Sequence, residues 1–160
     1  MISVSWDEIN RLSLKIASII RNNNIQYNCI IGISRSGLVP AVIIAHALGE
    51  KNLTSISIQR NKTDNINSEK MFPNMEEDIG LLMAQKYNHW IIIDDIVGSG
   101  ETIKYIRKTF TVPNRTIFVA SLFFNSSNGD VNKINNFVDY FGQEKQSWVR
   151  FPWERPIKSI

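Results

Sequence analysis

The order of apolar and polar positions along the chain predicts alternating strands and helices. Three apolar runs have the composition of strands covered on both faces of a parallel sheet, and a fourth run alternates like a strand. These four segments are 27–33, 90–93, 116–124 and 54–59. Before and between these segments, apolar residues recur at helical spacing at 6–21, 38–48 and 102–110. We therefore expect an α/β fold, with a parallel twisted sheet flanked by helices.

Local signals mark where several of these elements begin, end or approach one another. Ser5 and Glu8 have the Ser-x-x-Glu spacing of a capping box, which predicts the start of the first helix. Gly49 closes the second helical pattern. Gly32 lies inside the first predicted strand, where it indicates that another backbone approaches closely.

Two polar stretches interrupt the pattern and predict loops. Residues 60–74 are polar and contain little to build a core, so we expect a long flexible loop at about 60–75, followed by a short helix at 78–86. Residues 125–136 are also polar and precede a short strand at 137–141. We interpret about 125–160 as a small hood on a single domain that covers residues 1–160.

Composition restricts the class of protein. The chain of 160 residues carries a net charge of +3, which falls short of a nucleic-acid footprint, so we expect no nucleic-acid partner. Its apolar runs are shorter than the ~20 residues needed to span a bilayer, and the N-terminus does not resemble a secretion signal, so we expect no membrane association. Cys29 is the single cysteine, in an apolar segment, which favours strand packing and a cytoplasmic protein.

The stretch 90–102 carries the strongest chemical signal. Asp94 and Asp95 follow its apolar run directly, at the end of a strand where open α/β sheets place their ligands. Gly98 and Gly100 then allow backbone N–H groups to turn inward, before a helix that begins at Thr102. A glycine turn between strand and helix can be purely structural, but a structural turn does not require two adjacent acids. The stretch therefore favours a ligand with a phosphate and with hydroxyls or a bound metal, most simply a phosphorylated sugar.

Two further segments allow either a functional or a structural interpretation. Arg35, Ser36 and Gly37 lie at the end of the first strand and before a helix, which suits a second phosphate group; the alternative is a surface turn with a solvated arginine. Trp148 and Trp153 belong to an aromatic tail that could stack on a planar base or could form a hydrophobic plug.

The central stretch resembles the signature of type I phosphoribosyltransferases, which use 5-phosphoribosyl 1-diphosphate (PRPP), through the letters IIIDDIVGSGET. The resemblance implies that Asp94 and Asp95 are catalytic and hold the ribose, that Asp95 binds Mg²⁺, and that the following loop binds the 5′-phosphate. Together with the loop after the first strand, the implied PRPP-binding residues are Arg35, Ser36, Gly37, Asp94, Asp95, Gly98, Ser99, Gly100, Glu101 and Thr102.

Other segments are similar to the xanthine–guanine and hypoxanthine group of this family. GISRSGLVPA resembles its pyrophosphate loop, which can contain a non-proline cis peptide, expected here at Ser34–Arg35 or one bond later. The tail resembles the base-binding end of these enzymes, which implies that Trp148 and Val149 border the base. The family also closes a flexible loop over the reacting centre, where Arg60 and Lys62 are candidate cations for the pyrophosphate.

The sequence departs from 6-oxopurine enzymes at three places. Gly98 occupies a position that usually holds an aspartate directed at the purine N7 proton. Phe124, a candidate base-binding residue, occupies the position of a lysine directed at the oxo group. Glu101 places a carboxylate in the phosphate loop, so it must point outward or be offset by Mg²⁺.

We therefore expect an enzyme that transfers the phosphoribosyl group of PRPP to a nitrogenous base, a purine by resemblance, with Mg²⁺ and release of pyrophosphate. Gly98 and Phe124 motivate two alternatives: a PRPP-binding regulator or non-catalytic subunit, and a transferase with an unusual acceptor. The resemblance also implies a homo-oligomer, a dimer or a tetramer.

Overall fold

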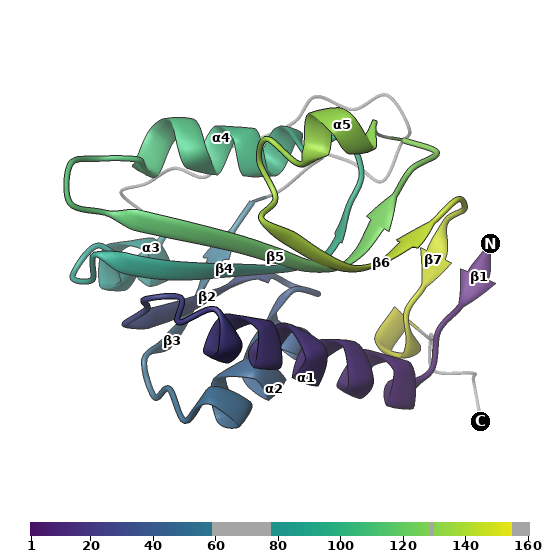
Figure 1. Ribbon diagram of the computed structural model, residues 1–160, viewed down its shortest axis with the longest axis horizontal. Helices are drawn as coiled ribbons and strands as arrows, with labels where there is room; N and C mark the ends of the chain where they lie inside the picture. Colours follow the sequence, from purple (N-terminus) through teal and green to yellow (C-terminus); the bar gives the residue numbers. More distant parts are fainter. Residues whose placement is uncertain (59–77, 129, 155–160) are drawn as a thin grey trace.

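The fold is a five-stranded parallel sheet between two layers of helices (Figure 1). The computed structural model describes residues 1–58, 78–128 and 130–154. The sheet has the order β3-β2-β4-β5-β6, and every neighbouring pair is parallel. Its strands are β2 (Cys29–Ser34), β3 (Leu53–Ser57), β4 (His89–Val97), β5 (Thr116–Asn125) and β6 (Tyr140–Lys145). This architecture confirms the fold class predicted from the sequence.

Helices cover both faces of the sheet. The helices are α1 (Trp6–Asn22), α2 (Leu38–Leu48), α3 (Ile79–Ala84), α4 (Glu101–Phe110) and α5 (Val131–Ile134). In Figure 1, α1 and α2 lie below the sheet, and α4 and α5 lie above it. None of the helices in the described ranges is long and apolar enough to cross a membrane.

The apolar run of β4 is explained by burial on both sides. Ile91 and Ile93 pack into the core that faces α1 and α2, whereas Trp90 and Ile92 pack into the core that faces α3 and α4. All four side chains are fully buried. A strand covered on both faces needs apolar residues at successive positions rather than at alternate ones, which is why the run is continuous.

Three local predictions are confirmed. The Ser5 hydroxyl accepts a hydrogen bond from the Glu8 N–H at 3.1 Å and caps α1, while the Glu8 carboxylate pairs with Lys145. Gly49 ends α2 in the left-handed conformation, with φ of 73°. A Cβ on Gly32 would lie 2.9 Å from the Leu38 Cα, so α2 does approach the backbone of β2 closely.

The element bounds differ from expectation in the second half of the chain. β4 continues to Val97 instead of ending at residue 93, because β5 also extends beyond that point and pairs with β4 as far as Phe124. Asp94 and Asp95 therefore lie within the strand rather than after it. Residues 131–134 form α5 inside the region expected as a loop, and β6 starts at Tyr140. The expected loop at 60–75, with Arg60 and Lys62, lies outside the described residues.

A second sheet of two strands joins the ends of the described chain. β1 (Ile2–Ser3) pairs in parallel with β7 (Val149–Arg150), and a short 3₁₀ helix follows at Pro152–Glu154. Figure 1 places β1 and β7 beside the N-terminal end of α1. Strands of two residues carry no recognisable periodicity, so this pairing could not be predicted from the sequence. It fixes the aromatic tail next to the main sheet.

Candidate active site

A cavity of about 580 Å³ opens at the carboxyl ends of β2, β3 and β4. Its wall is completed by the first turn of α4 and by the aromatic tail. The lining residues are Ile33, Ser34, Arg35, Ser36, Ser57, Ile58, Asp94, Asp95, Ile96, Thr102, Trp148, Val149, Phe151 and Glu154. This is the edge at which open parallel sheets bind their ligands, and the volume is that of a small-molecule site.

The two adjacent carboxylates lie on the central strand. Asp94 is only 4% exposed, and its Oδ1 accepts a hydrogen bond from the Asp95 N–H at 3.0 Å. Asp95 is half-buried. Because β4 is paired on both sides, with β2 and with β5, its backbone holds both acids at fixed positions in the cavity wall.

The loop after β4 leads into the N-terminus of α4. Gly100 precedes the helix with φ of 75°, a left-handed conformation that favours glycine, and it offers no side chain to cap the helix. The N–H groups at the start of a helix point outward along its axis, so this end of α4 has the geometry that suits an anion. Thr102 lies in this turn and reaches the cavity, whereas Gly98, Ser99, Gly100 and Glu101 are not in its wall.

The carboxylate of Glu101 is engaged on the helix surface. Its Oε1 accepts a hydrogen bond from Lys104 Nζ at 2.7 Å, in an ion pair between neighbouring turns of α4. Both side chains are exposed to solvent, at 48% and 36%. This pairing accounts for a negative charge beside a loop that suits phosphate.

The loop between β2 and α2 forms a second wall of the cavity. Its Ser34–Arg35 peptide is cis, as the resemblance led us to expect. Arg35 is exposed and lines the cavity with Ser36, whereas Gly37 packs beneath the loop and is not in the lining. A Cβ on Gly37 would lie 2.7 Å from the carbonyl oxygens of both Ile33 and Ile93, so only glycine fits there.

The two tryptophans of the aromatic tail fit different interpretations: one is placed to stack on a planar base, and the other packs as part of a hydrophobic plug. Trp148 is 62% exposed at the cavity, where its ring is accessible to a ligand. Trp153 instead packs inward, with its ring stacked on Phe151 at 4.6 Å and tilted against Trp6 at 5.7 Å. One tryptophan thus faces the site, and the other anchors the tail.

The backbone of Val149 is also oriented by the second sheet. The Ile2 N–H donates to the Trp148 carbonyl at 2.8 Å, and the Val4 N–H donates to the Arg150 carbonyl at 3.1 Å. β1 therefore bonds to the residues on either side of Val149, so the N–H and C=O of Val149 are directed away from β1. Val149 itself lines the cavity.

Phe124 is not brought to the cavity. Its side chain is fully buried in the core that faces α4, with its ring 5.3 Å from that of Phe141. The structure thus places this candidate base-binding residue among packing residues of the sheet and not in the lining of the cavity.

Sequence reasoning missed several residues of the cavity wall. Ser57 ends β3 and Ile58 follows it, and the carboxyl end of β3 lies at the same edge of the sheet as those of β2 and β4. The rule that ligands bind at this edge could have included them. Glu154 was part of the tail pattern, but its place in the wall depends on the 3₁₀ turn, in which its carboxylate accepts the Phe151 N–H at 2.9 Å.

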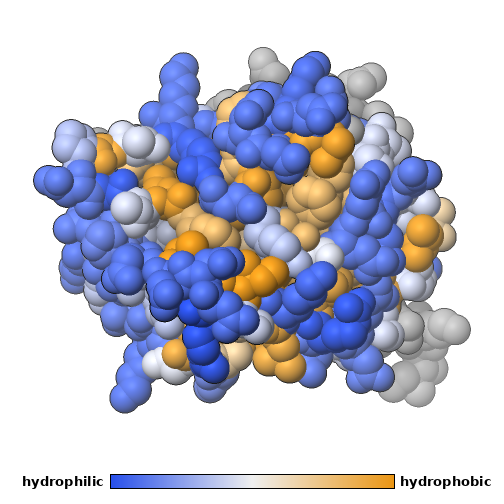
Figure 2. Space-filling view, in the orientation of Figure 1, coloured by the Kyte–Doolittle hydropathy of each residue, from blue (hydrophilic) through white to orange (hydrophobic). Residues whose placement is uncertain are grey.

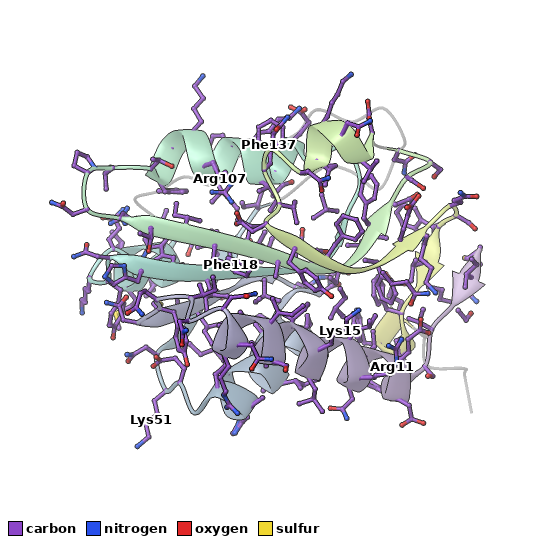
Figure 3. All side chains as sticks on the ribbon, in the orientation of Figure 1. Arg11, Lys15, Lys51, Arg107, Phe118 and Phe137 are labelled. Atoms are coloured by element: carbon purple, nitrogen blue, oxygen red, sulfur yellow. The ribbon has the colours of Figure 1, made fainter. Side chains whose placement is uncertain are left out.

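Arg107 ties α4, and with it the loop before α4, to the rest of the domain. Its Nε donates to the Phe137 carbonyl at 2.7 Å, its Nη1 donates to the Ile117 carbonyl, and its Nη2 pairs with Asp139. Figure 3 shows this side chain directed from α4 toward the sheet. The position of the helix N-terminus at the cavity is therefore fixed from the opposite end of the helix.

The carboxylates suit a magnesium ion that arrives with a phosphorylated substrate. Among the described residues, no three His, Cys, Asp or Glu side chains form a metal cluster. Mg²⁺ retains several waters and is commonly bound by one or two carboxylates together with substrate phosphates. The hard oxygens of Asp94 and Asp95 match that pattern, and they do not form a closed metal cage.

Comparison with known proteins assigns the chain to a family. The model of the phosphoribosyl transferase domain family matches residues 5–159. The chain therefore belongs to the phosphoribosyltransferase family, as the central motif indicated.

Two of the similar proteins are bacterial xanthine-guanine phosphoribosyltransferases. The chain is 27% identical to a xanthine-guanine phosphoribosyltransferase of Cereibacter sphaeroides, over 98% of this chain and 89% of that protein. It is 26% identical to the xanthine-guanine phosphoribosyltransferase of Idiomarina loihiensis, with the same coverage. Both alignments extend over almost the whole chain.

Solved structures share the fold. A purine phosphoribosyltransferase from Pyrococcus horikoshii is 23% identical, with a TM-score of 0.68 over 99% of this chain and 97% of that chain. A protein from Neisseria gonorrhoeae, solved with bound ppGpp, is 21% identical, with a TM-score of 0.72 over 96% and 89%. At these identities the likeness establishes the architecture.

Proposed function

We propose that this phosphoribosyltransferase transfers the 5-phosphoribosyl group of PRPP to a ring nitrogen of a purine base and releases pyrophosphate. The observation that carries this proposal is the composition of the cavity wall. Two carboxylates, a helix N-terminus, an arginine loop and an aromatic tail meet around one space of about 580 Å³. Each matches a different part of the two substrates.

The PRPP side of the cavity is assigned by charge and by hydrogen-bonding capacity. Asp94 and Asp95 accept hydrogen bonds from the ribose hydroxyls. The first turn of α4, with Thr102, binds the 5′-phosphate through N–H donors and the helix dipole. Arg35 and Ser36 bind the pyrophosphate, because a guanidinium forms charge-assisted hydrogen bonds with phosphate oxygens.

Magnesium belongs to this proposal. Asp95, with Asp94 beside it, would hold Mg²⁺, which when bound neutralises charge on the departing pyrophosphate. The protein's own contribution is positional: the paired backbone of β4 fixes the carboxylates, and the loops fix the two phosphate groups on either side of them. Catalysis then rests on alignment of the base nitrogen with ribose C1 and on stabilisation of charge that develops there.

The base side is assigned to Trp148 and Val149. The exposed ring of Trp148 offers a stacking surface for a planar base. The N–H and C=O of Val149 present a donor and an acceptor on the side of β7 that faces away from β1. A 6-oxopurine carries a ring N–H next to its oxo group, so this backbone pair can recognise it without the lysine that Phe124 replaces.

The comparisons favour a transferase over a PRPP-binding regulator. The curated relatives that align over nearly the whole chain are xanthine-guanine phosphoribosyltransferases. Gly98 and Phe124 are the positions at which the sequence departs from the pattern of 6-oxopurine enzymes. Gly98 does not lie in the described cavity wall, and Phe124 is a core residue.

The experiment that tests the proposal is a measurement of pyrophosphate release from PRPP and Mg²⁺ with a panel of purines and pyrimidines. Turnover that depends on guanine, xanthine, hypoxanthine or adenine supports the proposal and identifies the acceptor. Turnover with pyrimidines alone contradicts the base assignment. PRPP binding without turnover of any base favours the regulator, and the absence of PRPP binding contradicts the assignment of the cavity itself.

We also propose that the chain self-associates and acts in the cytoplasm. Figure 2 shows apolar residues gathered over β5 and β6, bordered by polar ones, and β6 is an edge strand of the five-stranded sheet. Phe118 of β5, labelled in Figure 3, is a partly buried residue of this region. Unpaired sheet edges with apolar side chains favour association. Light scattering at assay concentration tests the self-association, and a monomer would contradict it.

A further inference from the structure

A hydrogen bond joins the aromatic tail to the loop assigned to pyrophosphate. The indole Nε1 of Trp153 donates to the Ser36 hydroxyl at 3.2 Å, between residues 117 positions apart in the sequence. Ser36 lines the cavity, and Trp148 and Val149 of the same tail border it from the base side. The bond therefore links the two walls between which base and pyrophosphate would bind.

The donor of this bond is held rigidly. The Trp153 ring stacks on Phe151 with an interplanar angle of 14°, and Phe151 is itself only 2% exposed. The 3₁₀ turn is closed by two hydrogen bonds, from the Phe151 N–H to Glu154 Oε2 and from the Glu154 N–H to the Phe151 carbonyl. Trp153 thus has a fixed ring plane and a fixed N–H direction.

The contact with Trp153 limits the hydrogen bonds that the Ser36 hydroxyl can make. A serine hydroxyl has one proton to donate and lone pairs that accept, whereas an indole N–H can only donate. While the Ser36 oxygen accepts the Trp153 N–H, its own proton must point to a different acceptor. The Ser36 carbonyl is separately used by the Val39 N–H at 3.2 Å, at the start of α2, so the backbone around the hydroxyl is also fixed.

We propose that Trp153 is a positioning residue for PRPP: it orients the Ser36 hydroxyl so that its proton is donated to an oxygen of the pyrophosphate group. This inference rests on the proposed function and extends it, because it assigns a role on the PRPP side to a residue of the base-side tail. Trp153 acts through Ser36 and does not itself line the cavity.

The test is a pair of substitutions measured singly and together. Trp153→Phe keeps an aromatic ring on Phe151 and removes the N–H donor, and Ser36→Ala removes the hydroxyl. Trp6→Phe is the matched control, since it removes another indole N–H from the same aromatic cluster without touching Ser36. For each variant, KM for PRPP, KM for the accepted base, kcat and the melting temperature are measured.

Each single substitution is expected to raise KM for PRPP by about two- to tenfold, the range that one net hydrogen bond supports. The double variant should match Ser36→Ala, because Trp153 acts only through the hydroxyl. KM for the base should change less than twofold, and Trp6→Phe should leave KM for PRPP as in the wild type.

Three results would overturn the inference. The first is an unchanged KM for PRPP in Trp153→Phe, and the second is full additivity of the two substitutions in their effect on KM for PRPP. The third is a rise of KM for both PRPP and the base together with a fall in melting temperature, which would indicate a hydrophobic plug without a role in PRPP binding. If Trp153→Phe does not fold, the affinity of Ser36→Ala for PRPP is measured by titration instead. An affinity within twofold of the wild-type value would overturn the inference. A wild-type protein that binds PRPP but turns over no base would refute the transferase, while the titrations would still test the role of Trp153.

Discussion

Gly37 packs directly on the backbone of Asp94: a Cβ built on Gly37 would lie 3.1 Å from the Asp94 Cα. The same Cβ would lie 2.7 Å from the carbonyl oxygen of Ile93. The loop assigned to pyrophosphate and the strand that carries the carboxylates are therefore in van der Waals contact, with no room for a methyl group. The distance between the two halves of the site is set by this glycine.

Gly37→Ala is expected to reduce activity at least tenfold, because the loop must move away from β4 and carry Arg35 with it. Overpacking of this kind costs about 1–3 kcal/mol of unfolding free energy. Steady-state kinetics with PRPP and denaturant unfolding measure the two effects. Gly49→Ala is the control: nothing lies within 4 Å of its Cβ, so the strain at φ of 73° should lower stability and leave KM for PRPP unchanged.

Asp95→Asn is expected to lower PRPP turnover by about a hundredfold or more while the protein remains folded. The amide keeps the size of the side chain but loses the charge needed for Mg²⁺ and for the ribose hydroxyls. Pyrophosphate release and circular dichroism measure activity and folding. Asp7→Asn, an exposed acid in the first turn of α1, should retain full activity. Full activity in Asp95→Asn would remove Asp95 from the site.

The two glycines of the loop before α4 should respond differently to alanine. Gly100 has φ of 75°, so Gly100→Ala strains the backbone by about 1–2 kcal/mol, and its Cβ would meet Ile134 Cδ1 at 2.7 Å. Ile134 can rotate away, but the strain stays and shifts the start of α4. Gly98→Ala meets only Asn128 Cβ at 3.3 Å, which a shift of a few tenths of an ångström relieves.

The measurement for this pair is KM for PRPP together with the melting temperature. We expect Gly100→Ala to raise KM at least fivefold and to lower the melting temperature, and Gly98→Ala to change both only slightly. Equal effects of the two substitutions would contradict the assignment of the 5′-phosphate to the first turn of α4, since only Gly100 adjoins that turn.

The elements of the fold could be predicted because their periodicity is long and regular. The helix over 6–21 and the strand over 116–124 are within one residue of the observed α1 and β5 at each end. The end of β4 could not be predicted, because Asp94 and Asp95 carry no strand signal and are held in the strand by pairing with β5. β1 forms only because the tail supplies its partner, far away in sequence.

The site was predictable where it follows from the topology and not where it depends on packing. Arg35, Asp94 and Asp95 follow or end apolar strands, so a parallel sheet brings them together at one edge. Phe123 and Phe124 belong to the two different cores, and the sequence does not say which face each one meets. Likewise, only the stacking of Trp153 on Phe151 decides which tryptophan faces the cavity.

Cys29 provides a prediction that concerns stability alone. Burial in β2, and secondarily the charge of Glu50, raises the pKa of its thiol from 9.0 to about 11. The unfolded chain therefore loses this proton at lower pH than the native protein does. The contribution of this thiol to the free energy of unfolding is fully present below pH 9 and is lost as the pH rises from about 9 to 11.

A shift of this size corresponds to about 2–3 kcal/mol of unfolding free energy. Between pH 8 and a pH near 11, we expect the unfolding free energy measured in urea to fall by this much more in the wild type than in Cys29→Ala. Lysine and tyrosine ionisations are common to both proteins and cancel in the difference, as does the cavity left by the substitution. Because the native thiol is buried and protonated, it should also resist alkylation until the chain unfolds. Parallel pH profiles for the two proteins, or rapid alkylation of the folded wild type, would show that Cys29 is not held as a buried neutral thiol.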